Sequence, residues 1–141
     1  MPVIRRGEAG DLERVAAIQA ACPEAAGWDV ADYLKHDFLV AVEGPGPAVI
    51  AGFLVSRTVA HDEREILNLA VAPEFRRKQI ARSLLENLLR DFHGAVYLEV
   101  RESNSVAIRF YNAMQFKEFS HRKKYYAETL EAAIVMKFHS C

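Results

Sequence analysis

Apolar residues recur along this chain with two different periods, and the changes between the two periods predict the secondary structure. Leu12, Val15 and Ile18 have helical spacing, so residues 11–21 are predicted to form a helix with one buried face. Alternating or continuous apolar runs predict strands instead. These strands are expected at residues 3–5, 38–42, 49–59, 65–72 and 96–100.

Two further helices are predicted on either side of the 65–72 strand. Residues 27–29 are expected to interrupt regular secondary structure. A short helix that contains Val30, Tyr33 and Leu34 is expected to follow them. After the strand, an amphipathic helix is expected to end at Gly94. Its apolar face consists of Ile80, Leu84, Leu85, Leu88, Leu89 and Phe92.

The last part of the chain predicts one more helix and two closing strands. Ser103 or Asn104 is a suitable residue to cap the helix. The strands are expected at residues 117–125 and 132–139. The buried stripe of the helix is predicted to be Val106, Ala107, Phe110, Tyr111 and Met114.

The resulting order, β-α-α-β-β-β-α-β-α-β-β, predicts an α/β (α+β) fold. A strand–helix–strand crossover lies between antiparallel hairpins, which implies a mixed sheet. We expect six to seven strands, mostly antiparallel, with helices on both faces.

The composition mainly argues against certain functions and sites. The 141 residues suit a single domain over residues 1–141, and a formal charge of −1 argues against a surface for nucleic acid. Cys22 and Cys141 are most simply reduced thiols of a cytoplasmic protein. No run approaches the ~20 apolar residues of a membrane span, and the five scattered histidines do not predict a metal site.

Residues 66–81 carry the most specific local signal. An apolar strand ends at Pro73, and a short basic loop leads directly into the amphipathic helix. The N-terminus of a helix presents unpaired backbone N–H groups and a partial positive charge, so this arrangement favours a phosphate or pyrophosphate. The alternative is that the basic side chains are merely solvated. These side chains are Arg76, Arg77, Lys78 and Arg82.

Three polar residues downstream are candidates for chemistry, and each has a simpler alternative. Alternation places Glu99 on the opposite strand face from Leu98 and Val100; it is either a functional carboxylate or a solvated residue that pairs with Arg101. Tyr111 is either a core aromatic or a proton donor, because a buried hydroxyl needs a partner. Asn104 is either a helix cap or a ligand-binding residue.

The motif Arg76-x-x-Gln79-x-Ala81 and the order of elements resemble the GNAT superfamily of acetyl-CoA-dependent N-acetyltransferases. The loop of that superfamily reads Gln/Arg-x-x-Gly-x-Gly/Ala. The segment Leu98-Glu99-Val100-Arg101-Glu102-Ser103-Asn104, with Phe110-Tyr111 and Arg122-Lys123-Lys124-Tyr125-Tyr126, is similar to the bacterial ribosomal-protein-alanine N-acetyltransferases, the RimI type.

This resemblance implies a role for each matching residue. Glu99 would be the general base, and Tyr111 the acid that protonates the departing thiolate. The backbone of Leu69 to Val71 would pair with the pantetheine arm, and the Val71 amide would also bind the thioester carbonyl and its developing oxyanion. Asn104 would hold the pantetheine further along. The backbone from Arg77 to Arg82 would hold the pyrophosphate of acetyl-CoA. The full cofactor-binding set implied is Leu69, Ala70, Val71, Arg76, Arg77, Lys78, Gln79, Ile80, Ala81, Arg82 and Asn104.

The implied activity is acetyl transfer from acetyl-CoA to a primary amine, above all the N-terminal α-amine of a ribosomal protein. The family's ribosomal target begins Ala-Arg, and the acidic residues Glu24, Asp29 and Asp32 would attract such a basic peptide. Two alternatives stay open: acetylation of a small amine (a polyamine, aminoglycoside or amino acid), and a non-catalytic module that binds acyl-CoA. We expect a monomer or weak homodimer.

The sequence departs from the family pattern at three places. Gln79 and Gln115 stand where the family has glycine, at positions where a positive φ is plausible. Near the C-terminus, Ala127 and Ala132 replace the proline and aspartate of the family's Tyr-Tyr-Pro and Asp-Ala elements.

Overall fold

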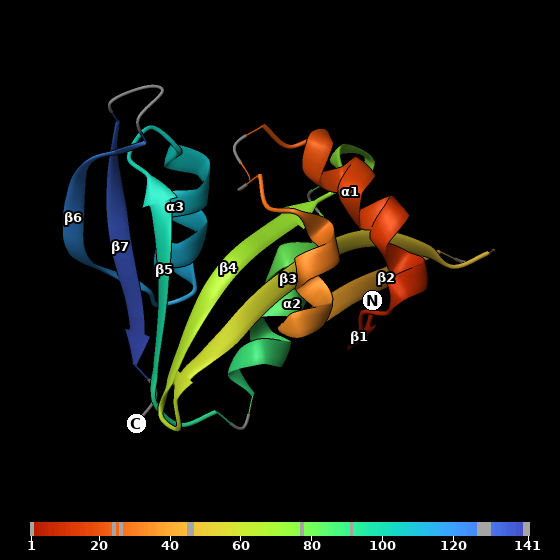
Figure 1. The fold of residues 1–141 in the computed structure, drawn as a ribbon, viewed down its shortest axis with the longest axis horizontal. Helices are drawn as coiled ribbons and strands as arrows, with labels where there is room; N and C mark the ends of the chain where they lie inside the picture. Colours follow the sequence, from red (N-terminus) through yellow and green to blue (C-terminus); the bar gives the residue numbers. More distant parts are fainter. Residues whose placement is uncertain are drawn as a thin grey trace. The chain divides into compact units, whose positions relative to one another are not determined.

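The computed structural model describes residues 2–23, 25, 27–44, 47–76, 78–90, 92–126 and 131–139, with the backbone alone for residues 123–126. Seven strands form one sheet in the order β1-β2-β3-β4-β5-β7-β6 (Figure 1). The strands are β1 (Val3–Arg6), β2 (Asp37–Glu43), β3 (Val49–Ala60), β4 (Glu63–Val71), β5 (Ala95–Arg101), β6 (Lys117–Tyr126) and β7 (Glu131–His139).

Within the described ranges, three α-helices and three short 3-10 helices lie between these strands. The α-helices are α1 (Leu12–Ala20), α2 (Ile80–Leu89) and α3 (Ser105–Ala113). The 3-10 helices are η1 (Ala9–Asp11), η2 (Val30–Lys35) and η3 (Pro73–Phe75). The short helix predicted around Tyr33 is therefore a 3-10 helix.

The sheet is mixed, as predicted. The pairs β1–β2, β2–β3, β5–β7 and β7–β6 are antiparallel, whereas β4 and β5 are parallel. The parallel ladder joins Glu63–Glu65 to Ala95–Tyr97, and residues 67–71 of β4 follow it. The crossover through α2 produces this parallel pair, as expected for a β-α-β unit.

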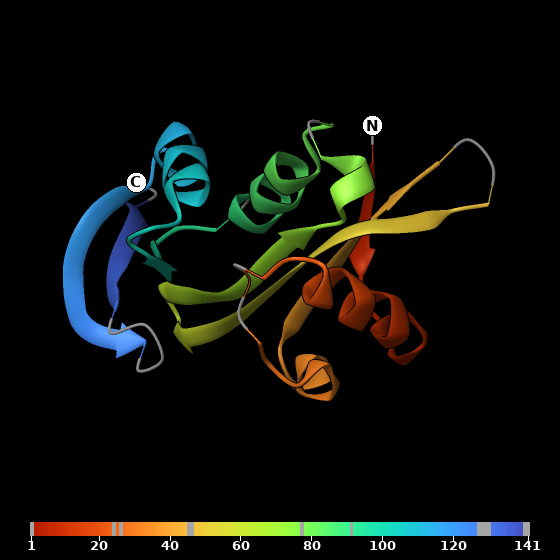
Figure 2. The ribbon, with the colours of Figure 1, turned by 90° about the horizontal axis from the view of Figure 1, so that it is seen from above.

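The chain forms two compact units. Unit 1 consists of residues 1–57 and 67–91, and unit 2 of residues 58–66 and 92–141. In unit 1, α2 lies on one face of the strands, and α1 and η2 lie on the other (Figure 2). The core on the α1 side is built from both periods of the sequence, since Val15 and Ile18 of α1 meet Val40 and Phe53 of the strands.

Unit 2 has a separate aromatic core under α3. The Tyr111 ring contacts Phe116 with centroids 5.5 Å apart, and Phe116 contacts Phe138 of β7 at 5.5 Å. Phe138 pairs with Val96 of β5, so α3 covers the face that carries Val96, Leu98 and Val100. All three of these β5 side chains are buried.

Two details of the helices differ from the prediction. Helix α2 ends at Leu89 with Arg90 already extended, so Gly94 does not end it. Gly94 has φ +148°, and a Cβ there would lie 2.1 Å from the Asp62 carbonyl oxygen. Close backbone approach explains this glycine. Val106 and Leu34 are 69% and 47% exposed, because each helix turns a narrower face to its core than the apolar spacing suggests.

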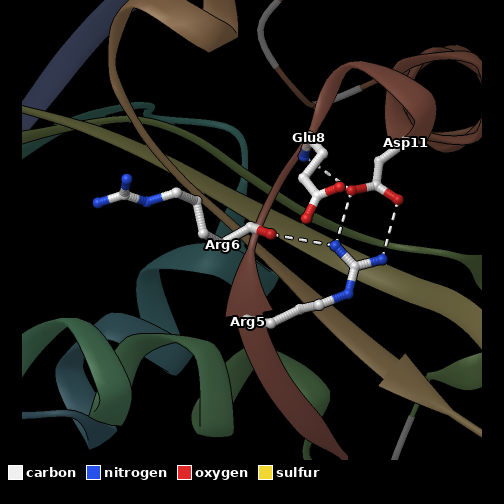
Figure 3. A network of polar contacts seen from close by, with 4 residues as sticks. All are labelled: Arg5, Arg6, Glu8 and Asp11. Atoms are coloured by element: carbon white, nitrogen blue, oxygen red, sulfur yellow. Dashed lines mark hydrogen bonds and ion pairs between the residues drawn. The ribbon is translucent and has the colours of Figure 1, made fainter.

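A bidentate ion pair holds the entry to α1 (Figure 3). Arg5 Nη1 and Nη2 donate to Asp11 Oδ2 and Oδ1 at 2.8 and 2.9 Å. Asp11 Oδ2 also accepts the Glu8 N–H at 2.8 Å. These hydrogen bonds from Arg5, opposed by burial and reinforced by the Glu8 N–H, hold the pKa of the Asp11 carboxyl below its usual value.

Replacing Asp11 by Ala is expected to lower the free energy of unfolding at pH 7 by about 1–3 kcal/mol, because a charged acceptor of three hydrogen bonds is lost. A group with a lowered folded pKa stabilises the fold above its unfolded pKa, and this contribution disappears as the pH falls through the folded pKa. The difference between wild type and Asp11→Ala in urea unfolding should therefore shrink below about pH 4.

The exposed carboxylate of Glu13, in the first turn of α1, offers a matched control. Glu13→Gln should change the free energy of unfolding by less than about 0.5 kcal/mol. A difference for Asp11→Ala that stays constant from pH 7 to pH 3 would contradict the prediction.

Among the described residues, no helix combines the length and apolarity that crossing a membrane requires.

Candidate active site

The loop between β4 and α2 in unit 1 has the geometry expected for an anion site. The chain leaves β4 at Val71, makes one 3-10 turn from Pro73, and enters α2 at Ile80. Arg76 and Lys78 are exposed in the loop, and Lys78 Nζ lies 5.8 Å from the centre of the Phe75 ring. Arg77 lies outside the described residues.

Gln79 is the residue immediately before α2, and it adopts a left-handed conformation with φ 59° and ψ 28°. Its carbonyl accepts the Ser83 N–H at 3.0 Å, which makes it the first acceptor of the helix. The N–H groups of Ile80, Ala81 and Arg82 belong to the first turn, where helices leave donors for ligands. The positive φ expected at this family glycine position is therefore present, with glutamine in place.

The backbone of β4 presents alternate residues to opposite sides. The Ala72 N–H donates to the Ala51 carbonyl oxygen of β3 at 2.8 Å, so Ala72 and Ala70 point their polar groups toward β3. Leu69 and Val71 consequently direct their N–H and C=O groups away from β3. These are the backbone groups that the sequence assigned to pantetheine binding.

Cys22 connects this strand end to the basic loop. Its Sγ donates to the Val71 carbonyl oxygen at 3.4 Å and accepts from Arg76 Nη2 at 3.6 Å. The cysteine is buried and free of disulfide bonding, whereas Cys141 lies outside the described residues. The Arg76 guanidinium therefore contacts the segment that follows the C-terminal end of α1.

In unit 2, Glu99 projects from the sheet face opposite α3. Its carboxylate oxygen Oε1 lies 2.5 Å from Arg122 Nη1 of β6, and the Glu99 side chain is 22% exposed. The sequence predicts Arg101 as the partner in the solvated alternative, and the structure shows an ion pair with Arg122. Arg122 can reach Glu99 because β7 places β6 and β5 on its two sides.

Asn104 and Tyr111 belong to α3. Asn104 Oδ1 accepts the Ala107 N–H at 3.2 Å, so the residue is the helix cap, and its Nδ2 takes no part in that bond. Tyr111 is 8% exposed and stacks edge-on against Phe110 with ring centroids 5.1 Å apart. Burial raises the pKa of the Tyr111 hydroxyl well above its usual value, so the proton is retained at neutral pH.

Gln115 adopts the second positive φ of a non-glycine residue among the described residues, at 74°. The N–H of Phe116 donates to the Tyr111 carbonyl at 2.9 Å, and the N–H of Gln115 donates to the Asn112 carbonyl at 3.1 Å. This pair of bonds is a Schellman motif, in which the residue after the helix is left-handed. Helix geometry thus explains the family's glycine at this position.

The left-handed conformation predicts how substitutions at residue 115 rank in stability. Glycine reaches this region without a steric penalty, glutamine costs about 1 kcal/mol, and a β-branched residue costs more. Gln115→Gly should therefore unfold at a higher temperature than wild type, and Gln115→Val at a lower one. Thermal unfolding followed by circular dichroism tests the order, and a glycine variant no more stable than the valine variant would contradict it.

Each unit brings together part of the predicted site. Unit 1 contains the pantetheine strand, the basic loop and the α2 N-terminus. Unit 2 contains Glu99, Asn104 and Tyr111, with Glu99 and Tyr111 on opposite faces of the β5–β7–β6 strands. Among the basic residues, Arg82 Nε lies 3.4 Å from Glu86 Oε2, so Arg82 forms an ion pair within its own helix.

The acidic residues expected to attract a basic peptide are only partly available for that role. Asp32 Oδ1 lies 3.1 Å from Lys35 Nζ, and Asp29 Oδ1 accepts the Ala31 N–H at 3.0 Å as the cap of η2. Glu24 lies outside the described residues. Within the described ranges, no group of three or more His, Cys, Asp or Glu side chains is arranged to hold a metal ion.

Comparison with known proteins identifies the family. The acetyltransferase (GNAT) family model matches residues 11–116, and the chain belongs to this family. Over 93 residues the chain is 37% identical to the [ribosomal protein bS18]-alanine N-acetyltransferase of Escherichia coli K12, a segment that covers 62% of each protein. The chain thus spans about three fifths of the length of this curated relative.

Solved structures agree with that assignment. The crystal structure of the E. coli ribosomal-protein-S18-alanine N-acetyltransferase superposes with a TM-score of 0.80 at 28% identity, covering 100% of this chain and 96% of that one. Naa20 of Chaetomium thermophilum, solved with a bisubstrate analogue, has a TM-score of 0.81 at 26% identity, covering 98% of this chain and 86% of that one.

Sequence reasoning missed two sets of contacts. The motif that contains Arg122 marks the family, but nothing in it indicates that Arg122 contacts Glu99. Asn68 is a polar residue at a buried position of an otherwise apolar strand, and the structure shows it bonded to Gln19 and Tyr33. A buried polar side chain requires partners, and that requirement was the available signal.

Proposed function

We propose that this protein transfers the acetyl group of acetyl-CoA to the N-terminal α-amine of a protein, with a ribosomal protein that begins with alanine as the first candidate. Membership of the acetyltransferase (GNAT) family carries the proposal. The 37% identity to an enzyme named for alanine N-acetylation of ribosomal protein bS18 supports the acceptor class. Gln79 keeps the left-handed conformation expected at the family's glycine, which supports binding of acetyl-CoA by this loop.

In this mechanism Glu99 removes a proton from the acceptor, directly or through a water molecule. An ammonium group cannot attack a thioester while it is protonated. At pH 7 deprotonation costs about 1.4 kcal/mol for an α-amine of pKa ~8, but about 4.6 kcal/mol for a lysine of pKa ~10.4. A single carboxylate is therefore better suited to a chain terminus than to a lysine side chain.

The attack forms a new C–N bond, and the carbonyl carbon becomes tetrahedral with negative charge on its oxygen. The Val71 N–H, directed away from β3, is the proposed donor to this oxygen. Collapse breaks the C–S bond as the nitrogen releases its second proton to water, and the thiolate of coenzyme A takes the proton of the Tyr111 hydroxyl. The Tyr111 phenolate then regains a proton from water, and Glu99 releases its proton to water before the next turnover.

The remaining proposed contacts hold the cofactor. Leu69–Val71 would pair with the pantetheine arm, and the Nδ2 group of Asn104 would donate to it while Oδ1 caps α3. The pyrophosphate would rest on the first-turn N–H groups of α2 with help from Arg76, Arg77 and Lys78. Bound acetyl-CoA supplies the activated acetyl group.

The proposal is tested by thiol release from acetyl-CoA with a peptide that begins Ala-Arg. The matched control is the same peptide with its N-terminus already acetylated and a lysine retained. Turnover with the free terminus alone supports the proposal. Turnover on a polyamine or aminoglycoside but on no peptide would instead assign a small-molecule acetyltransferase. Tight binding of acetyl-CoA without turnover on any amine would assign a binding module.

Other expectations from the sequence remain predictions. A single catalytic domain over residues 1–141, a cytoplasmic location, and a monomer or weak homodimer are all consistent with an enzyme that acts on protein N-termini. Analytical ultracentrifugation would test the oligomeric state directly.

A further inference from the structure

A chain of side-chain hydrogen bonds crosses unit 1, and the proposed chemistry does not use it. Gln19 Nε2 of α1 donates to the Trp28 carbonyl oxygen at 2.7 Å. Gln19 Oε1 accepts from Asn68 Nδ2 at 3.1 Å. Asn68 Oδ1 accepts the N–H of Leu69 at 3.0 Å. The chain thus begins in the segment before η2 and ends at the first residue of the proposed pantetheine strand.

Tyr33 of η2 closes this chain into a triangle. Its hydroxyl donates to Gln19 Oε1 and accepts from Asn68 Nδ2, the latter at 3.0 Å. Tyr33 is 1% exposed and Asn68 is 6% exposed, so water cannot replace these partners easily. Burial, opposed in part by the bond from Asn68, raises the pKa of the Tyr33 hydroxyl, which therefore stays protonated as a donor.

The direction of the chain is fixed at both ends by the backbone. A backbone N–H can only donate and a backbone C=O can only accept, so the orientations of the Asn68 and Gln19 amides follow from Leu69 and Trp28. A flip of Gln19 would place its oxygen against the Trp28 carbonyl. A flip of either amide would break at least one of these hydrogen bonds, so the orientation of each amide depends on the other.

The two ends of the chain have different surroundings. Leu69 belongs to the proposed cofactor strand. Gln19 and Trp28 line a hollow of about 440 Å³ between α1 and the segment that leads into η2, whose wall also includes Cys22, Asp29 and Val30. We call it the α1–η2 hollow. The wall of this hollow is therefore connected to the Leu69 N–H by side-chain hydrogen bonds.

We infer that Gln19, Tyr33 and Asn68 are positioning residues that fix the cofactor strand relative to the wall of the α1–η2 hollow. Asn68 also occupies the Leu69 N–H, so Val71 supplies the N–H of this strand segment to acetyl-CoA. The inference rests on the proposed binding of acetyl-CoA by Leu69–Val71. It predicts that a substitution that breaks these side-chain hydrogen bonds weakens the binding of acetyl-CoA, although the substituted residue is not itself a proposed contact of acetyl-CoA.

The main test is calorimetric titration of acetyl-CoA into the Asn68→Asp variant. Aspartate keeps the shape and an acceptor for the Leu69 N–H, but an ionised carboxylate has no donor for Gln19 and Tyr33. The Kd for acetyl-CoA is expected to rise about tenfold, which is the size of one lost buried hydrogen bond. Asn112→Asp, the same change at an exposed residue of α3, is the matched control and should leave the Kd unchanged.

A double-mutant cycle separates positioning from general support of the fold. In a Gln19→Ala background, Gln19 Oε1 no longer faces the carboxylate that Asn68→Asp introduces. Asn68→Asp should then raise the Kd for acetyl-CoA by less than about threefold. Tyr33→Phe retains the packing of a buried ring, and it provides a variant that tests the chain if Asn68→Asp folds poorly. In steady-state assays the KM for acetyl-CoA should rise more than kcat falls.

Three results would overturn the inference: an unchanged Kd in Asn68→Asp and Tyr33→Phe, a fall in melting temperature without a change in Kd, or fully additive effects in the cycle. The calorimetry requires no acceptor, so it is independent of the peptide assay. A wild-type protein that binds acetyl-CoA but acetylates no peptide would contradict the proposed acceptor and leave this test intact. No binding by wild type would contradict both.

Discussion

Replacing Glu99 by glutamine is expected to lower acetyl transfer to an Ala-Arg peptide by about 10²- to 10⁴-fold near pH 7. Glutamine has nearly the same shape but cannot accept a proton from the acceptor ammonium. The variant then depends on the fraction of amine that is already neutral. That fraction rises with pH through the amine pKa of ~8, so the ratio of wild-type to variant rates should narrow from pH 6 to pH 9.

The ion pair with Arg122 requires its own control, because Glu99→Gln also removes a charge from a contact of 2.5 Å. Arg122→Met removes the same ion pair and retains the carboxylate. Its rate loss should be smaller than that of Glu99→Gln and should not narrow with pH. Glu102→Gln, at an exposed position shortly after β5, controls for the general loss of a carboxylate. A wild-type to Glu99→Gln ratio that is constant with pH would remove Glu99 from the base role.

Replacing Tyr111 by phenylalanine is expected to lower kcat by about a hundredfold, because the thiolate would then leave without a proton donor. The ring and its contacts with Phe110 and Phe116 are retained, so the Kd for acetyl-CoA and the melting temperature should change little. Stopped-flow or steady-state thiol release measures kcat, and calorimetry measures the Kd.

The pH profile provides a second check on Tyr111. Burial raises the pKa of this hydroxyl above its ordinary value of 10.0, so the acid remains protonated as the pH rises to that value. The wild-type rate should consequently show no falling limb from Tyr111 below pH 10. Tyr97→Phe removes a hydroxyl from the same unit, on β5, and serves as the matched control. Equal losses in Tyr111→Phe and Tyr97→Phe would contradict the acid role.

Local patterns predicted most of the fold because backbone geometry sets their periods. Alternation along residues 95–100 correctly placed Glu99 opposite the buried Leu98 and Val100. The family motif correctly marked residues 79 and 115 as positions of positive φ, which the structure shows at 59° and 74°. At residue 115 the positive φ follows from the helix terminus, because the Schellman motif places the residue after α3 in the left-handed region. A residue just before a helix is usually extended, so the left-handed Gln79 is a feature of the loop before α2.

The end of α2 and the exposure of Val106 were not predictable in the same way. An apolar residue at helical spacing is buried only if a neighbouring element covers it. Phe92 continues the spacing of α2 but lies beyond its last residue, Leu89, and the Arg64 guanidinium stacks on its ring 4.9 Å from the centre. The spacing of apolar residues in one helix contains no information about which other element will pack against them.

The sequence by itself determined the order of elements, the strand face of Glu99, the basic loop before α2 and the family. Only the tertiary structure decided the partners of the polar side chains. Arg122 reaches Glu99 from 23 residues away, and Asn68 reaches Tyr33 and Gln19 across 35 and 49 residues. The physical reason is that periodicity is a property of a single segment, whereas a hydrogen bond between distant residues depends on which strands and helices become neighbours.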